Sequence, residues 1–330
     1  MGDAGYDPFP LGRDPVGVRT IQAHDAARDR TFPGEIWYPA HTRHAGRDAK
    51  RDAAARPGAH PLIIFSHYSG GHRRVATFLG THLASHGYAV AAMDHSEVVT
   101  PELARRDGET DAERAARIDA IAASRVPDVR FLLAHLLRSG MGDGAWFDPA
   151  RVGLAGHSFS GWTVLATPDT EPLVRAVVAL APGGSSRPRP GVLPLTLAFA
   201  WGRYIPALFL AAEDDVPIPL DGVRELYDRA PTPKRMFVLR RADHQHFVDD
   251  VEGEHEALRA MSLPGDAAWI PAAMRPVTEL CTGEQAHTFT RALTLAHLDA
   301  TLRGSDAAQE FLAGDAEAAL AAHGVEAIAC

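Results

Sequence analysis

The sequence predicts an α/β protein in which a mostly parallel, doubly wound sheet of about eight strands is covered by helices on both faces. Short aliphatic runs recur along the chain, and each is followed by a turn and then by a helical pattern. Such runs are typical of βα units whose strands are buried on both faces. The hydrophobic fraction of 46% in 330 residues is also enough for the large core that such a sheet needs.

The expected elements follow one another in the order that this architecture requires. Two short segments, 16–22 and 34–38, come first with no helix after either, so we expect an antiparallel pair at the sheet edge. The expected parallel strands are 61–66, 88–94, 151–156, 174–180, 206–212 and 234–239. The expected helices are 73–86, 128–138, 162–166, 221–228 and 284–302. Ligands of such sheets bind beyond the carboxyl ends of the strands.

The length suggests two domains at about 150 residues each, but the strand pattern favours one. Segment 182–191 has the composition of a linker, yet strands of the same expected sheet lie on both sides of it. We therefore expect one domain over residues 1–330 with its core at about 15–305. Three lid-like insertions account for the excess length and are expected to set substrate choice: 96–125, 183–204 and 251–283.

Composition excludes several classes of partner. The net charge of −9 argues against nucleic acid and against an anionic membrane surface. Two cysteines are too few for a disulfide framework, and the first fourteen residues lack the basic start and apolar run of a secretory signal. The most apolar stretch, 192–212, is interrupted by Pro194, Arg203 and Pro206 and is no membrane span. We expect a cytoplasmic protein with a small-molecule substrate, as a monomer or a homodimer.

The strongest chemical signal is a serine between an expected strand and an expected helix. Gly156-His157-Ser158-Phe159-Ser160 is close to the G-x-S-x-G nucleophile elbow, with Ser160 in place of the last glycine. A strand that turns sharply into a helix holds the serine hydroxyl out at the top of the sheet, and small neighbours prevent collisions around it. The alternative is a helix N-cap, in which the serine only accepts backbone N–H groups.

A serine nucleophile needs a histidine base and a carboxylate that orients it, and both follow in the order this fold demands. The strand 206–212 ends in Glu213-Asp214-Asp215, and the strand 234–239 is followed by Asp243-His244-Gln245-His246. Three separate strand ends therefore converge on a serine, an acid and a histidine. The spacing leaves open which aspartate and which histidine take part.

The same segments resemble the α/β-hydrolases. Phe65-Ser66-His67, the serine motif, the acidic loop after Pro206 and His244-Gln245-His246-Phe247 are similar to the platelet-activating-factor acetylhydrolase and dienelactone hydrolase-like esterases, a group near the bacterial polyester hydrolases. The segments 16–20 and 37–39 fit the early strands of that group, so the resemblance covers about residues 15–305.

The resemblance implies a role for each residue. Ser158 is the expected nucleophile and His244, rather than His246, the expected base. Asp215 is preferred over Asp214 as the orienting acid, because Val216 and Pro217 follow it as in the family. Two backbone N–H groups are expected to form the oxyanion hole, one from Phe159 after the nucleophile and one from Ser69, where relatives carry glycine one position earlier.

The substrate is expected to be a small to medium hydrophobic or aromatic carboxylic ester. Part of this expectation is an apolar lip formed by segment 193–205, which leaves a strand end together with segment 96–125. The expected pocket residues are Tyr68, His157, Trp162, Trp201, Tyr204 and His246. No cofactor and no metal are expected for this chemistry.

Three alternatives remain beside the ester hydrolase. The same residues suit an amidase or lactonase, or a hydrolase of polyester oligomers. His244 and His246 with the acids near them suggest a metal-dependent hydrolase, although no second ligand cluster is visible at another strand end. A protein of this fold that only binds a ligand is the alternative of another class.

Overall fold

The computed structural model describes residues 5–41, 49–95, 108–263 and 265–330. Its described strands form one sheet in the order β10-β9-β8-β7-β6-β4-β5-β2-β1-β3. The strands are β1 Val16–Asp25, β2 Arg30–Pro39, β3 Lys50–Arg51, β4 Gly58–Ser66, β5 Ala89–Met93, β6 Ala145–His157, β7 Val174–Leu180, β8 Ala207–Ala212, β9 Lys234–Leu239 and β10 Ala327–Ala329. The α-helices are α1 Thr77–Ser85, α2 Asp111–Ser139, α3 Phe159–Ala166, α4 Leu220–Arg229, α5 Val251–Arg259, α6 Ile270–Ala273, α7 Gly283–Leu302, α8 Asp306–Ala313 and α9 Ala316–Ala322.

The predicted sheet is confirmed in its centre and extended at its edges. All pairs from β5 through β4, β6, β7 and β8 to β9 are parallel, and β1 pairs antiparallel with β2 as predicted. Two strands that the sequence did not predict, β3 with two residues and β10 with three, lie at the two edges. Both are too short for a hydrophobic alternation to be visible in the sequence.

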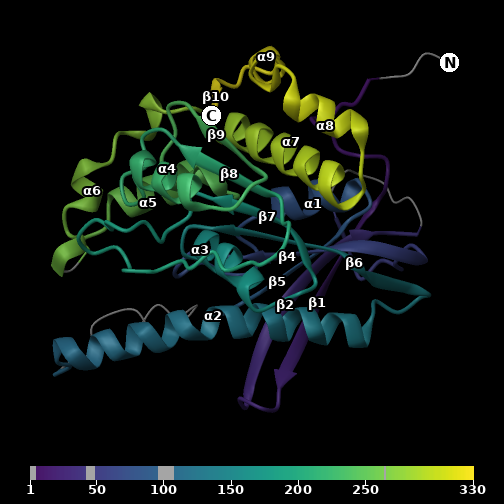
Figure 1. The fold of residues 1–330 in the computed structure, drawn as a ribbon, viewed down its shortest axis with the longest axis horizontal. Helices are drawn as coiled ribbons and strands as arrows, with labels where there is room; N and C mark the ends of the chain where they lie inside the picture. The colour runs from purple at the N-terminus through teal and green to yellow at the C-terminus, as the bar shows by residue number, and fades with distance from the viewer. Residues whose placement is uncertain (1–4, 42–48, 96–107, 264) are drawn as a thin grey trace.

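Alternate side chains of the strands enter two cores, one on each face of the sheet. Ile63 and Phe65 of β4 pack on the face that α1 and α7 cover, whereas Leu62 and Ile64 face the core beneath α2, α3 and α4. Figure 1 shows α1 and α7 on one side of the sheet and α2 along the opposite side. The helices on both faces leave the carboxyl ends of the parallel strands to loops, where the predicted site residues lie.

The insertion predicted at 96–125 differs from the structure. Residues 96–107 lie outside the described part of the chain, and residues 111–125 belong to the 29-residue helix α2, which was predicted to begin only after Pro127. Thr110 and Glu113 form a capping box that starts this helix earlier, and exposed Pro127 is accommodated inside it. The Thr-x-x-Glu spacing is the signal that sequence reasoning missed. The exposed first turns of α2 extend beyond the body of the molecule (Figure 1).

Candidate functional site

The serine motif forms a sharp turn between β6 and α3. Ser158 directly follows the strand, precedes the helix, and has a φ of 61° and a ψ of −117°. A non-glycine residue with positive φ is strained and persists where the surroundings enforce it. A Cβ on Gly156 would lie 2.4 Å from the Ser160 carbonyl oxygen, and one on Gly161 would lie 2.6 Å from the Pro182 Cα. The turn therefore depends on these two glycines, while the position of Ser160 tolerates a small side chain.

Gly156→Ala tests this dependence. Because the new methyl group meets backbone rather than a flexible side chain, we expect a loss of about 1–3 kcal/mol in the free energy of unfolding, the usual cost of overpacking. The measurement is equilibrium unfolding in urea. Gly5→Ala is the matched control, since a Cβ there has nothing within 4 Å. Equal stability of the two variants would contradict this account of the turn.

The structure brings Ser158, His244 and Asp215 together. The Ser158 hydroxyl lies 2.8 Å from His244 Nε2, and His244 Nδ1 lies 2.7 Å from Asp215 Oδ2. An ionised carboxylate only accepts hydrogen bonds, so Nδ1–H donates to Asp215 and Nε2 is left to accept from the serine. His244 and Asp215 are buried, whereas Ser158 is half-buried and reachable.

The two other residues that the sequence left open point elsewhere. Asp214 forms an ion pair with Arg275 at 3.3 Å, near the surface. His246 is buried, and its Nε2 lies 3.1 Å from the Cys281 carbonyl oxygen while its Nδ1 contacts the backbone of Asp243. Both ring nitrogens of His246 are thus engaged with the main chain, which leaves none to hold a metal. In the described part of the chain, no group of three or more His, Cys, Asp or Glu side chains has the arrangement of a metal site.

Backbone contacts hold the acid and the base in place. The Ile218 N–H donates to Asp215 Oδ1 at 2.7 Å. Asp243 Oδ1 accepts from the N–H of His244 at 2.6 Å and from that of Val216 at 3.0 Å, so one buried carboxylate ties the two loops together. Asp243 is a residue that the sequence analysis did not select. Its place immediately before His244, at the start of a 3₁₀ turn, is the capping signal that would have indicated it.

Two opposing effects set the proton affinity of the base. Burial acts to lower the pKa of His244, but the charge and the hydrogen bond of Asp215 outweigh it and raise that pKa above its ordinary value. The imidazolium form of His244 is therefore stabilised by the carboxylate. An imidazole in this environment can accept a proton from a neighbouring hydroxyl and return it.

The two amides predicted to form the oxyanion hole come from two separate segments. The Phe159 amide begins α3, and Ser69 lies in the loop after β4. In that loop, the Tyr68 carbonyl oxygen accepts from the Gly71 N–H at 3.0 Å and lies 2.7 Å from His67 Nδ1. Because a peptide unit is planar and trans, holding this carbonyl turns the Ser69 N–H to the opposite side.

Three predicted pocket residues lie beside this group and three do not. The His157 ring lies 4.6 Å from the His244 ring and 5.5 Å from the Tyr68 ring, and Trp162 packs near Phe159. The ring nitrogens of His246 contact the main chain of Asp243 and Cys281, as described above. Trp201 belongs to the core under the sheet and donates to the Leu165 carbonyl, because an indole needs one buried acceptor. Tyr204 is 76% exposed, so most of its side chain faces solvent.

The lip predicted for 193–205 is therefore only partly correct. Leu195 packs with Phe159 and with Ile121 of α2, whereas Leu197 belongs to the main core. A second apolar cluster, formed by Val216, Ile270 and Met274, lies next to Asp215 in sequence. Two small apolar clusters thus flank the site, outside the two cores of the sheet.

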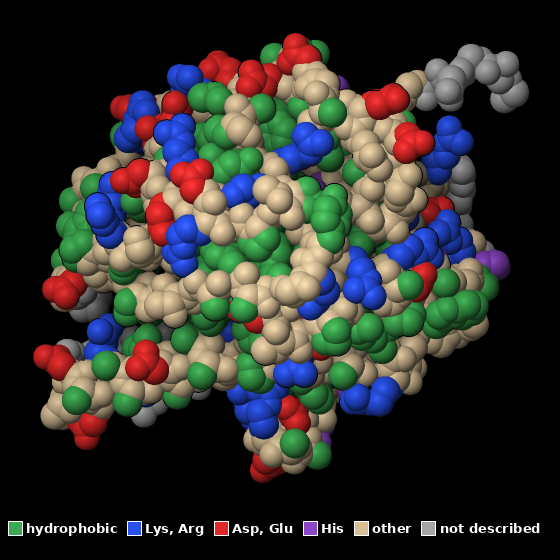
Figure 2. Space-filling model, viewed as in Figure 1, with side chains coloured by type: hydrophobic (Ala, Val, Ile, Leu, Met, Phe, Trp, Pro, Cys, Tyr) green, Lys and Arg blue, Asp and Glu red, His purple; other side chains and the backbone are tan. Residues whose placement is uncertain are grey.

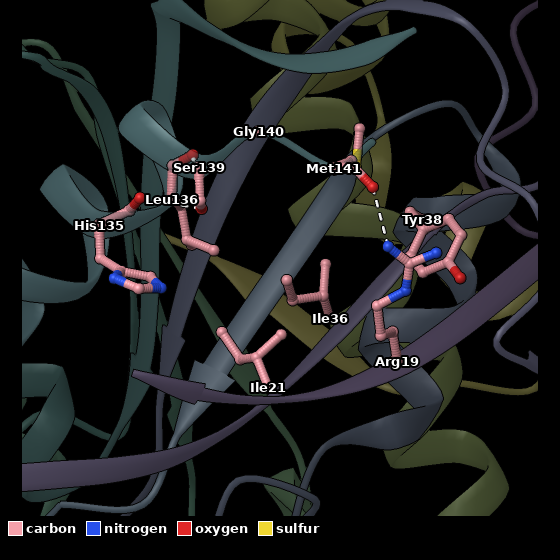
Figure 3. A pocket seen from close by; sticks show the side chains of 9 residues that line it. All are labelled: Arg19, Ile21, Ile36, Tyr38, His135, Leu136, Ser139, Gly140 and Met141. Atoms are coloured by element: carbon pink, nitrogen blue, oxygen red, sulfur yellow. Dashed lines mark hydrogen bonds between the residues drawn. The ribbon is translucent and has the colours of Figure 1, made fainter. Parts of the chain in front are cut away.

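Two hollows on the described part of the surface lie away from Ser158. Figure 3 shows a pocket between β1, β2 and the end of α2, lined by Arg19, Ile21, Ile36, Tyr38, His135, Leu136, Ser139, Gly140 and Met141. Its volume of about 50 Å³ has room for one or two water molecules and for no ester. A hollow of about 430 Å³ lies between residues 185–189, which belong to the predicted insertion 183–204, and the start of α4. Its charged lining residues are Arg187, Arg189, Asp221 and Glu225.

The chain is similar to proteins of known activity. A family model described as platelet-activating factor acetylhydrolase, isoform II, matches residues 32–117, which include the loop after β4 but not Ser158. The platelet-activating factor acetylhydrolase of Cavia porcellus is 25% identical over 323 residues, which cover 74% of this chain and 70% of that protein. The structure of a ferulic acid esterase from Streptomyces cinnamoneus has a TM-score of 0.64 and 23% identity, and covers 90% of this chain and 92% of that one. The predicted fold and the predicted resemblance are confirmed.

Proposed function

Because this chain is an α/β-hydrolase of the esterase group, we propose that it is a serine hydrolase that cleaves carboxylic esters through an acyl-enzyme on Ser158. The observation that carries the proposal is the hydrogen-bonded series from Ser158 through His244 to Asp215. This series has the geometry of a nucleophile, a general base and an orienting carboxylate.

Each member of the series has one step in the proposed reaction. His244 Nε2 accepts the Ser158 proton as the oxygen attacks the ester carbonyl, and the charge of Asp215 stabilises the resulting imidazolium. The amides of Phe159 and Ser69 stabilise the oxyanion, at about 3–4 kcal/mol per donor. His244 then protonates the leaving alcohol, and water repeats the steps on the acyl-enzyme. All proton transfers use side chains, so the proposal needs no cofactor.

The apolar clusters beside the serine support an ester with a hydrophobic acyl group. Phe159, Leu195 and Ile121 offer aliphatic and aromatic surface next to the nucleophile. One relative is named for an acetyl group and the other for an aromatic acid, so the acyl preference of this chain is a matter for measurement. A panel of para-nitrophenyl esters from acetate to decanoate, with ferulate esters and matched amides beside it, tests the class. Turnover confined to amides, lactones or polyester oligomers would replace the ester proposal.

Leu195→Ala tests the acyl preference. We expect kcat/KM for hexanoate relative to acetate to fall by about tenfold, since about 1–3 kcal/mol of apolar contact is lost with the side chain. Leu197→Ala is the matched control, because Leu197 is a leucine of similar burial that packs in the core instead. The same change of chain-length preference in both variants would remove the role of this cluster.

Two observations would select the other classes. Activity that a chelator removes and that survives the loss of the Ser158 hydroxyl would indicate a metal-dependent hydrolase. Saturable ligand binding without turnover would indicate a binding protein.

None of the described helices is long and apolar enough to span a bilayer. The cytoplasmic location, the single domain and the oligomeric state stay predictions, and size-exclusion chromatography with light scattering measures the last.

A further inference from the structure

A cluster of buried polar side chains lies directly behind the proposed oxyanion hole. Its members come from four segments that are distant in sequence: Ser66 at the end of β4, His95 after β5, Arg125 and Asp128 on α2, and Ser160 on α3. All five are at most 2% exposed. Buried polar groups are expensive unless they contact one another, so such a cluster indicates a defined arrangement.

Arg125 is the centre of this polar cluster. Its Nη1 donates to the Ser160 hydroxyl at 2.7 Å, to the His67 carbonyl at 3.1 Å and to the Ser66 hydroxyl at 3.4 Å. Its guanidinium carbon lies 4.3 Å from the centre of the Phe159 ring, within the range of a cation–π contact. One side chain of α2 thus contacts both segments that carry the proposed oxyanion amides.

We propose that Arg125 is the positioning residue of the oxyanion hole, which fixes the loop after β4 against the start of α3. This inference rests on the proposed function, since an oxyanion forms only in acyl transfer. Arg125 touches neither the substrate nor the reacting atoms. It acts through the His67 carbonyl, Ser160 and the Phe159 ring.

The planarity of the peptide unit explains how Arg125 acts. The His67 carbonyl oxygen accepts from both Arg125 and the Ser160 hydroxyl, so this peptide cannot rotate without losing two hydrogen bonds. The next carbonyl, that of Tyr68, is held by the Gly71 N–H. With two successive carbonyls held, the N–H groups of Tyr68 and Ser69 are fixed as well. Amides that are oriented before the reaction stabilise an oxyanion without a cost of reorganisation.

The same contacts give a reason for the departure from the serine motif. Ser160 stands where G-x-S-x-G has its second glycine, and its hydroxyl bridges Arg125 and the His67 carbonyl. A glycine at this position would remove the hydroxyl and with it both hydrogen bonds. Ser160 on the elbow and Arg125 on α2 therefore act together, since both hold the His67 carbonyl.

The cluster also contains a carboxylate, that of Asp128. Asp128, one turn later on α2, lies 3.0 Å from His95 Nδ1 and 2.6 Å from Arg28 of the β1–β2 turn. His95 Nε2 in turn lies 2.8 Å from the Ser66 hydroxyl that Arg125 contacts. A continuous series of contacts therefore links α2, the β1–β2 hairpin and the loop after β4.

The experiment compares Arg125→Met, Arg125→Lys and Ser160→Gly with the wild-type protein. The active sites are first counted from the amount of a fluorophosphonate that each protein binds covalently at completion, so that misfolded molecules do not enter kcat. We expect kcat per active site to fall about 100-fold in Arg125→Met and about tenfold in Ser160→Gly, with KM within about twofold, because one oxyanion donor is worth 10²–10³ in kcat. Arg125→Lys is expected to recover part of the loss. The affinity for a trifluoromethyl ketone, which forms a tetrahedral adduct, should fall in parallel with kcat.

Arg130→Met is the matched control, because Arg130 lies on the same helix, is exposed, and pairs with Glu171 at 3.4 Å instead of entering the cluster. The pH at which kcat/KM falls on acidification should be the same in all variants, since His244 keeps its hydrogen bond to Asp215. If Arg125→Met does not fold, Ser160→Gly carries the test. Normal kcat per site and normal ketone affinity in the folded variants would overturn the positioning role. Ester turnover by a wild-type protein that forms no fluorophosphonate adduct on Ser158 would instead overturn the proposed function.

Discussion

Ser158→Ala is expected to lower kcat for para-nitrophenyl acetate by at least about 10⁴-fold, because removal of the nucleophile leaves only the residual catalysis of binding and oxyanion stabilisation. The substitution removes one hydroxyl whose contact is His244 Nε2, at 2.8 Å. The elbow keeps its glycines, so the fold should be unaffected. The measurement is steady-state turnover with circular dichroism and thermal unfolding on the same sample.

Ser139→Ala is the matched control for this prediction. Ser139 is the last residue of α2 and lines the small pocket of Figure 3, whose lining includes none of the proposed catalytic residues. We expect its turnover to stay within twofold of the wild-type value. Full esterase activity of a folded Ser158→Ala variant would contradict the proposal and would return the metal-dependent alternative.

Asp215→Asn is expected to lower kcat by about 10⁴-fold and to move the pH profile, as loss of the orienting carboxylate does in serine proteases. The carboxylate of Asp215 raises the pKa of His244 above its ordinary value of 6.5. His244 accepts a proton only when it is neutral, so wild-type kcat/KM should fall as the pH drops through a value above 6.5. Without the carboxylate this acid limb should lie at lower pH. The measurement is kcat/KM between pH 5 and 9.

Asp214→Asn distinguishes the two adjacent acids. Asp214 pairs with Arg275 instead of His244, so we expect unchanged turnover and an unchanged acid limb in this variant. Loss of activity in Asp214→Asn with normal activity in Asp215→Asn would show that the acid is misassigned.

Local patterns predicted the sheet and the residues at its strand ends. The strands over 174–180 and 234–239 agree with β7 and β9 to the residue, because aliphatic runs buried on both faces between turns are unambiguous. Ser158, Asp215 and His244 follow three such strands, and parallel strands end at one edge of the sheet. Their proximity was therefore predictable from order alone. Their catalytic roles stay predictions.

Long-range packing was not predictable. Arg125 belongs to a polar stretch that the sequence analysis assigned to a lid-like insertion, yet it is fully buried against the loop after β4. A charged residue on a helix is usually exposed, and only the contact of α2 with β4 and α3 reverses this. The prediction that Trp201 lines the substrate pocket was wrong in the opposite way. An aromatic residue in a loop is as compatible with a core as with the lip of a pocket, and Trp201 lies in the core.

The central claim is that Ser158 is the nucleophile, and labelling with a fluorophosphonate tests it most directly. The reagent phosphonylates a serine that a neighbouring imidazole activates, and His244 Nε2 lies 2.8 Å from this hydroxyl. Peptide mass spectrometry after loss of activity should locate one adduct, on Ser158 within the segment 152–175. Inactivation with the adduct on another residue, or full activity with no adduct, would contradict the account.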